Sequence, residues 1–237
     1  MERRVTAPLL AELVGTFLFF FVGAGAATRG GTLLEVALAH GLVLLVMVSA
    51  LGAVSGGHFN PAVTFAIWLT GRMPTTTAAL YVVVQLAGGL LAGLLLRAIF
   101  PADVVATTHL GTPALGTGVS PFVGIVIEAV LTMILLFAVF GTAIDRRAPR
   151  VGGIAIGFAV GTDILMGGPL TGAAMNPARW FGPAVASTTF DNWYVWWIGP
   201  LVGAAIAALL WRGIFLEELE PERGPAAPTA PDPVPSA

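Results

Sequence analysis

Two short segments of the chain are built alike, and they limit most strongly what it can fold into. Gly56-Gly57-His58-Phe59-Asn60-Pro61-Ala62-Val63 recurs 116 positions later as Gly172-Ala173-Ala174-Met175-Asn176-Pro177-Ala178-Arg179. In each, an Asn stands where a helix N-cap belongs and a Pro stands at the first helical position, where its missing N–H costs nothing. The apolar residues that follow, 63–69 and 180–185, are too few to cross a bilayer. The pattern predicts two half-helices.

Both segments lie in sequence that is too apolar for a soluble domain. Hydrophobic residues make up 57% of the 237 residues, charged residues make up 10%, and the mean hydropathy is +0.89. We expect an all-α integral membrane protein with six transmembrane helices, since about 20 apolar residues are needed to cross the hydrocarbon core. The six apolar runs are Leu9–Ala27, Leu33–Val54, Thr77–Phe100, Pro121–Ile144, Val151–Met166 and Trp193–Leu216. Pro169 is expected to end the fifth span.

The spacing of the two segments extends to other residues. Glu12 recurs as Glu128 and Gly41 recurs as Gly157, again 116 positions apart, so the chain contains an internal repeat. We place the first repeat at about 5–100 and the second at about 121–216, in a single membrane domain of residues 1–216. Each repeat contains three of the six spans. Because this number is odd, the second copy enters the membrane from the opposite side and the repeats are inverted.

Segments outside the spans predict the orientation. The residues 102–120 are expected to form a long outer loop, and residues 217–237 a disordered Pro/Ala-rich cytoplasmic tail. Eight of the eleven arginines fall on the side shared by both termini, which places both termini in the cytoplasm: Arg3, Arg4, Arg72, Arg146, Arg147, Arg150, Arg212 and Arg223. We expect the cell (plasma) membrane as the location.

The sequence contains no Cys, and its three His are scattered, so we expect no metal site. We also expect no cofactor and no nucleic-acid partner.

Two Asn-Pro-Ala segments at the heads of opposed half-helices, in a six-span inverted repeat, resemble the aquaporin (major intrinsic protein) family. The resemblance covers roughly residues 5–216. It implies a passive channel for water, not an enzyme, that lies in the lipid bilayer as a homotetramer with one pore in each subunit. The pore residues implied are Asn60, Pro61, Ala62, Asn176, Pro177 and Ala178.

Elementary electrostatics then predicts how such a pore selects. A half-helix N-terminus carries about half a positive charge, so two that face each other at the midplane repel cations. Asn60 and Asn176 would each offer an N–H to a water oxygen, and the central water would donate outward in both directions. That orientation breaks a proton wire, so water passes while protons and ions are excluded.

The resemblance also places a selectivity filter at His40, Ile164, Ala173 and Arg179, a set similar to that of the tonoplast-intrinsic aquaporins of plants. An Arg inside a membrane segment is functional by default. Neutral imidazole can donate and accept, so His40 is expected to exchange partners with water or ammonia. In the outer loop, His109 resembles a loop histidine that extends the filter in those plant proteins, and we expect it close enough to influence Arg179. Ammonia passage is expected.

Other polar residues have both structural and functional interpretations. Glu12 and Glu128 would accept hydrogen bonds from the backbone before each Asn, and the rival interpretation is a proton-relay pair. His58 is a candidate for the lining of the cytoplasmic pore mouth, with packing as the alternative. Asp163 stands where we expect Asn in the plant relatives, and we consider His40, His109 or Arg179 as its partner. Trp180 replaces the small residue usual in water channels.

Three functional hypotheses remain besides the water channel. The first is a facilitator for glycerol or another small neutral solute, although His40 is polar where glycerol channels present an aromatic wall. An ion-coupled secondary transporter can also have inverted repeats and broken helices. The last is a structural membrane protein that has kept the fold and lost conduction.

Overall fold

The computed structural model describes residues 2–149 and 151–215, and the described chain is helical. The α-helices are α1 (Glu2–Thr28), α2 (Leu33–Ser55), α3 (Pro61–Leu69), α4 (Thr75–Ile99), α5 (Ala102–Thr108), α6 (Pro121–Val139), α7 (Gly152–Thr171), α8 (Pro177–Ser187) and α9 (Val195–Leu210). A short 3-10 turn, η1 (His109–Gly111), follows α5, and single π-helical turns, η2 (Phe140–Ile144) and η3 (Trp211–Phe215), extend α6 and α9.

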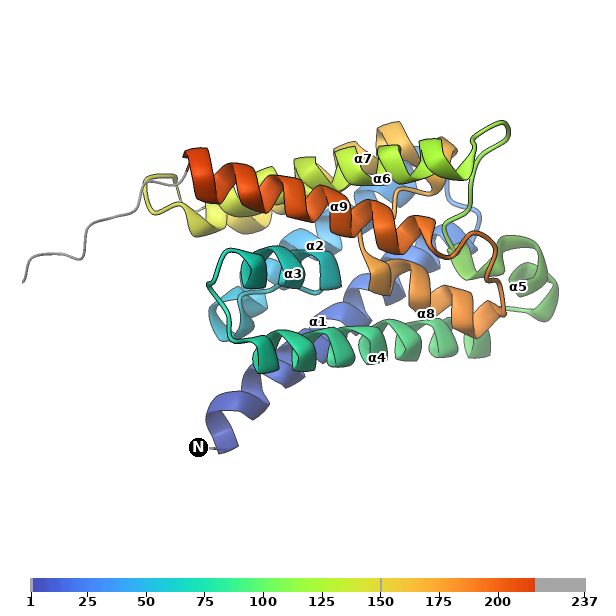
Figure 1. Ribbon diagram of the computed structural model, residues 1–237. Coiled ribbons are helices and arrows are strands. Elements are labelled where there is room, and N and C mark those ends of the chain that lie inside the picture. Colours follow the sequence, from blue (N-terminus) through green and yellow to red (C-terminus); the bar gives the residue numbers. More distant parts are fainter. Residues whose placement is uncertain (1, 150, 216–237) are drawn as a thin grey trace, which may run out of the picture.

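Six of these helices are long and apolar enough to cross a membrane, within the part of the chain that is described. They cover Thr6–Thr28, Leu33–Ser55, Thr75–Ile99, Pro121–Ile144, Gly152–Thr171 and Val195–Phe215, so each expected run overlaps one span. The start of α1 and the end of η3 lie at the same end of the bundle (Figure 1). The predicted tail, residues 217–237, lies outside the described residues.

Two local predictions were wrong. Pro169 does not end the fifth span, because α7 continues to Thr171 and stops at Gly172, whose φ of 78° is left-handed. The segment 102–120 is not wholly a loop, since α5 occupies its first part. Pro101 directly before the helix and Asp103 in its first turn both favour a helix start.

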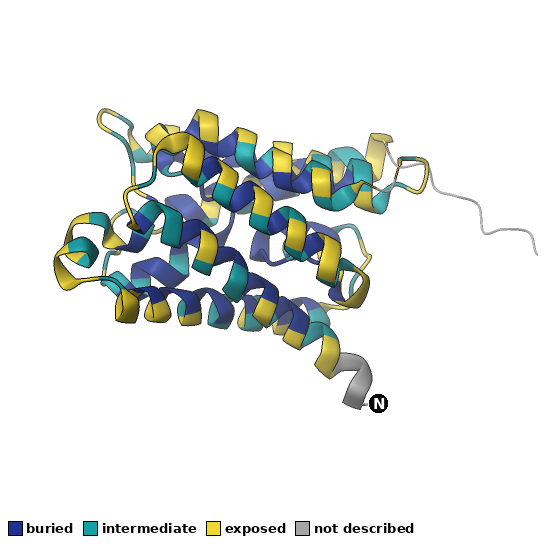
Figure 2. Cartoon of the chain, turned by 180° about the vertical axis from the view of Figure 1, so that it is seen from behind, coloured by how far each residue is buried: buried dark blue, intermediate teal, exposed yellow. Residues whose placement is uncertain are grey.

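The helices α3 and α8 are the two predicted half-helices, with 9 and 11 residues. They lie between the long helices, approach from opposite ends of the bundle, and point their N-termini at each other (Figure 1). Figure 2 shows that the outward faces of the long helices are exposed and that buried residues gather toward the centre of the bundle. This is the distribution expected when lipid covers the outside.

The repeats are in close backbone contact where α2 crosses α7. A Cβ added to Gly41 would lie 2.7 Å from the Gly157 oxygen, and one added to Gly157 would lie 2.4 Å from the Gly41 oxygen. Small residues therefore bring the two backbones into direct contact. The mutual contact of two residues that are 116 positions apart fits the inverted repeat predicted from their spacing.

Candidate pore and selectivity filter

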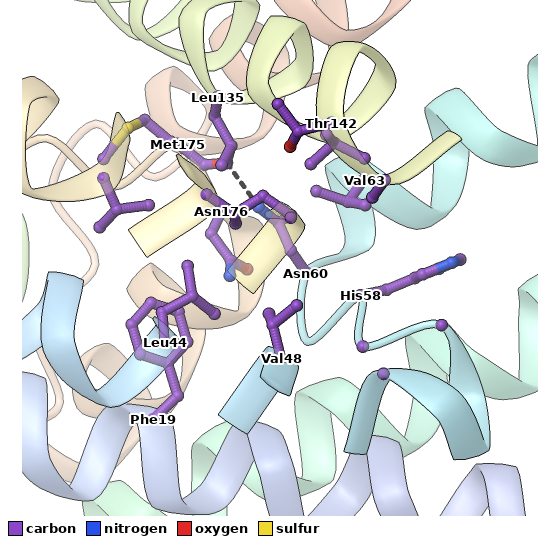
Figure 3. Close-up of a pocket in the computed structure, with 18 of the residues that line it drawn as sticks. Phe19, Leu44, Val48, His58, Asn60, Val63, Leu135, Thr142, Met175 and Asn176 are labelled. Atoms are coloured by element: carbon purple, nitrogen blue, oxygen red, sulfur yellow. Dashed lines mark hydrogen bonds between the residues drawn. The ribbon is translucent and has the colours of Figure 1, made fainter. Parts of the chain in front are cut away.

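Asn60 and Asn176 cap the two half-helices and join them to each other. The Asn60 Oδ1 accepts from the Ala62 N–H at 2.8 Å, and the Asn176 Oδ1 accepts from the Ala178 N–H at 3.0 Å. Each Nδ2 donates across the junction: Asn60 to the Met175 carbonyl at 2.9 Å (Figure 3), and Asn176 to the Phe59 carbonyl at 3.0 Å. A side-chain amide has two N–H groups, so each Asn keeps one for a molecule in the pore.

The backbone before each Asn is held by a buried carboxylate. Glu12 accepts from the backbone N–H groups of His58 at 2.9 Å and Phe59 at 2.7 Å, where Phe59 has a φ of 46°. Its Oε1 also accepts from the Ser55 hydroxyl at 2.6 Å. The predicted hydrogen bonds from the irregular backbone to Glu12 are therefore present, and they fix a backbone conformation that few non-glycine residues adopt.

Glu128 repeats this arrangement in the second half. It accepts from the backbone N–H groups of Ala174 at 2.9 Å and Met175 at 2.7 Å, and from the Thr171 hydroxyl at 2.7 Å. Met175 has a φ of 53°. A carboxylate that accepts three donors compensates for its own burial and leaves the loop carbonyls free of these N–H groups.

A continuous cavity of about 810 Å³ runs past this junction. His40 and Arg179 line it toward one end, and Asp145 and Arg146 of the loop after η2 line it toward the other. Apolar side chains make much of the wall between them, including Phe19, Leu44, Val48, Leu135 and Val63 (Figure 3). The cavity is therefore a mostly apolar tube that is polar at the Asn junction and at both ends.

The four predicted filter residues, His40, Ile164, Ala173 and Arg179, all line this cavity. Arg179 is 4% exposed; its Nε donates to the His40 Nε2 at 2.9 Å, and its Nη1 donates to the Gly111 carbonyl at 2.9 Å. The His40 Nδ1 lies 2.9 Å from the Val36 carbonyl. Since a carbonyl only accepts and an Arg Nε only donates, His40 is neutral with its proton on Nδ1.

That geometry corrects one expectation about His40. Both of its ring nitrogens are occupied by protein groups, so the ring does not exchange partners with water or ammonia. Instead it holds the Arg179 guanidinium, whose remaining N–H groups can point into the cavity. His40 thus sets the position of the Arg179 guanidinium in the cavity wall.

The prediction that His109 extends the filter was wrong. His109 is exposed, its Nδ1 lies 3.2 Å from the Thr189 hydroxyl, and it is not among the residues that line the cavity. The loop does reach Arg179, but through the carbonyl of Gly111. Leu110 is fully buried with a left-handed φ of 55°, and the next carbonyl, that of Gly111, faces Arg179 while the His109 side chain is exposed.

Asp163 has none of the three partners considered for it. It is 1% exposed, and neither carboxylate oxygen has a hydrogen-bond partner within the described chain. Trp180 does not narrow the cavity, because it stacks on Trp196 at a centroid distance of 5.8 Å and an angle of 7°. These two departures from the plant pattern therefore lie beside the pore and not in its lining.

At the opposite mouth, His58 lines the cavity and its Nδ1 lies 3.0 Å from the Thr64 hydroxyl. Nearby, the side chain and backbone N–H of Arg147 donate to Asp145 and lower the pKa of that carboxyl to about 2. Asp145 therefore stays ionised at neutral pH. The mouth carries a fixed ion pair together with the Arg146 cation.

Some residues of the site were missed by sequence reasoning. The Gln85 Nε2 donates to Glu12 at 2.8 Å and to Thr64 at 2.9 Å, from a fully buried position. An amide in an apolar span was the available signal. Ser55 and Thr171 also had a signal, since both hydroxyl residues stand directly before the repeated Gly.

Comparison with known proteins agrees with this arrangement. A family model described as Major intrinsic protein matches residues 2–211. The chain is 46% identical over 223 residues to aquaporin TIP4-4 of Zea mays, covering 89% of this chain and 87% of that protein. It is 42% identical over 246 residues to the probable aquaporin TIP3-2 of Arabidopsis thaliana, covering 94% and 90%.

Among solved structures, the aquaglyceroporin of Plasmodium falciparum shares the fold, with a TM-score of 0.77 and 21% identity over 89% of this chain and 96% of that one. None of these relatives supports the expected location in the plasma membrane specifically. They do support an integral membrane protein that is a passive channel for water and small solutes and not an enzyme. The chain belongs to the aquaporin, or major intrinsic protein, family.

Proposed function

We propose that this channel conducts water, that it also passes ammonia, and that it excludes protons and ions. The observation that carries the proposal is the junction of the half-helices, where Asn60 and Asn176 each keep one free N–H beside an otherwise mostly apolar wall. A water molecule at this point accepts from both amides. Its own hydrogens then point outward, and a chain of water molecules cannot relay a proton through it.

Two sources of positive charge support the exclusion of cations. The N-termini of α3 and α8 together present about one positive charge at the junction. Arg179 adds a guanidinium to the cavity wall, and within the described residues no carboxylate forms an ion pair with it. A cation that enters must lose its hydration shell next to these positive charges, whereas a neutral molecule meets no such repulsion.

Ammonia passage is supported by the cavity lining at Ala173 and Arg179. Ala173 leaves space that a larger side chain would fill, and ammonia, like water, can accept from Arg179 and from the two amides. With His109 outside the cavity and His40 engaged, this proposal depends on Ala173 and Arg179.

We further propose that one channel domain comprises both repeats, that both termini face the cytoplasm, and that the protein is a homotetramer with one pore in each subunit. The even number of spans and the arginines on the side of the termini support the orientation. The tetramer rests on family resemblance.

Stopped-flow measurements on reconstituted vesicles test the function. Water flux is followed by light scattering under an osmotic gradient, ammonia by internal alkalinisation, and glycerol by reswelling. We expect water and ammonia permeabilities well above those of empty vesicles and a lower permeability to glycerol. Ammonia flux equal to that of empty vesicles would remove ammonia alone, while saturable, proton- or sodium-dependent uptake would favour a transporter.

The same experiment can test the proposed filter separately. Arg179→Val should raise permeability to protons and glycerol while water flux continues, because the substitution removes both the charge and the long side chain from the cavity wall. Unchanged permeability to every solute would show that the filter is elsewhere.

A further inference from the structure

Two arginines bind the far ends of the half-helices, one in each repeat. The Arg97 Nη1 donates to the Ala186 carbonyl at 2.5 Å, near the C-terminus of α8. The Arg212 Nη1 donates to the Leu69 carbonyl at 3.3 Å, at the C-terminus of α3. Arg97 belongs to the first repeat and binds the half-helix of the second, and Arg212 does the reverse.

The two contacts are equivalent positions of the repeat. Arg212 follows Arg97 by 115 positions, and the same spacing relates Tyr81 of α4 to Trp196 of α9. Each of these aromatic side chains donates to a backbone carbonyl at the end of α2 or α7, both at 2.9 Å. The arginine contacts therefore recur as part of the fold's own symmetry.

Among the residues that the structure describes, no acid forms an ion pair with either arginine. The ion pairs found within the described residues are Arg29 with Glu35 and Arg147 with Asp145. The half-helices themselves contain no acidic residue. The charge of Arg97 and Arg212 is therefore available to the helix ends that they contact.

The physical consequence follows from the helix dipole. The C-terminus of each half-helix carries about half a negative charge, which partly offsets the field of its N-terminus at the pore junction. A cation bonded at the C-terminus cancels this negative end. Since α3 and α8 are only about 14 Å and 16 Å long, the far charge is still felt at the junction.

We propose that Arg97 and Arg212 are positioning residues for cation exclusion. Each ties the outer end of a half-helix to the opposite repeat and strengthens the positive field at the junction of Asn60 and Asn176. With the crossed amide bonds at the N-termini, each half-helix is bonded to the other repeat at both of its ends. The proposal rests on the ion exclusion proposed above.

The test measures proton permeability in vesicles, in an Arg179→Val background where the charge of the filter is absent. Arg97→Gln and Arg212→Gln should each raise proton permeability about two- to threefold at low ionic strength, and the effect should vanish at about 1 M salt, where the Debye length is about 3 Å. Lysine at either position should restore the parent value. Dividing by water permeability in the same vesicles removes any loss of folded protein.

Arg72→Gln is the matched control. Arg72 is exposed three residues beyond the end of α3, and no side-chain hydrogen bond is found for it among the described residues. Arg72→Gln removes a charge near the same helix end without removing a bond to the helix, so it should raise proton permeability clearly less than Arg212→Gln does. Arg212 is also exposed, so its variant carries the test if Arg97→Gln does not fold.

Several results would overturn the proposal. These are proton permeability unchanged in the double variant Arg97→Gln/Arg212→Gln, an increase that persists at high salt, or an equal increase in Arg72→Gln. A failure of the proposed channel function would look different, because the wild-type protein would then show no water permeability.

Discussion

Asp163 is a residue whose burial conflicts with its chemistry. Both of its carboxylate oxygens are buried without a hydrogen-bond partner in the described chain, next in sequence to Ile164, which lines the cavity. An unsatisfied buried polar group typically costs about 1–3 kcal/mol, and more when it is charged. The residue therefore weakens the fold at its own position.

We predict that Asp163→Asn raises the apparent melting temperature of the purified protein by several degrees. The amide keeps the size of the side chain and can donate as well as accept, without a charge to desolvate. Asp191→Asn at an exposed site is the control and should change stability by less than about 0.5 kcal/mol. A lower melting temperature for Asp163→Asn would show that the carboxylate is needed.

A contact of the site could be predicted from the sequence when a side chain makes it, and could not be predicted when a backbone group makes it. Asn60, Asn176 and the two glutamates were found because side chains recur visibly at a fixed spacing. The Gly111 carbonyl that holds Arg179 could not be found, because a backbone acceptor leaves no signature in residue type. His109, two residues earlier, drew attention because its side chain is conspicuous.

The half-helix α8 illustrates how tightly an element is fitted. Its Gly182 packs against α4 so closely that an added Cβ would lie 2.1 Å from the Gly89 carbonyl oxygen. Backbone meets backbone here, so no side chain can move aside. The contact fixes the position of α8, the half-helix that carries Arg179, against α4.

We therefore predict that Gly182→Ala destabilises the protein by more than about 2 kcal/mol, because overpacking forces the backbones apart. It should also reduce water permeability per folded molecule, since α8 must shift. Gly213→Ala provides the control, as Gly213 has open space around an added Cβ within the described residues, with no atom within 4 Å. Equal thermal stability of the two variants would contradict this packing.

Element boundaries could be predicted where a cap supplied them. Each Asn before its Pro starts a half-helix where the pattern indicates. The end of α7 was misjudged because Pro169 was weighed above Gly172. A proline in the last turn loses one backbone hydrogen bond, and the left-handed glycine is what reverses the chain.

At the scale of the whole molecule, the repeat determined what could be predicted. The number of spans followed from the six apolar runs. Inversion and the opposed half-helices followed from the 116-residue spacing and the odd number of spans in each half. The path of the cavity could not be derived in this way. It depends on which faces of six apolar helices turn inward, and helices that are apolar all round carry little periodic signal.

The central claim is that water crosses through the cavity between the two repeats. Filling that cavity with a bulky side chain tests the claim most directly. Val48 lines that cavity, whereas Val46 on the same helix is 52% exposed on the outer face. The measurement is osmotic water permeability per folded protein in vesicles, for wild type, Val48→Trp and Val46→Trp. We predict that Val48→Trp abolishes most of the protein-dependent permeability and that Val46→Trp leaves it unchanged. Full permeability in a folded Val48→Trp variant would contradict this account.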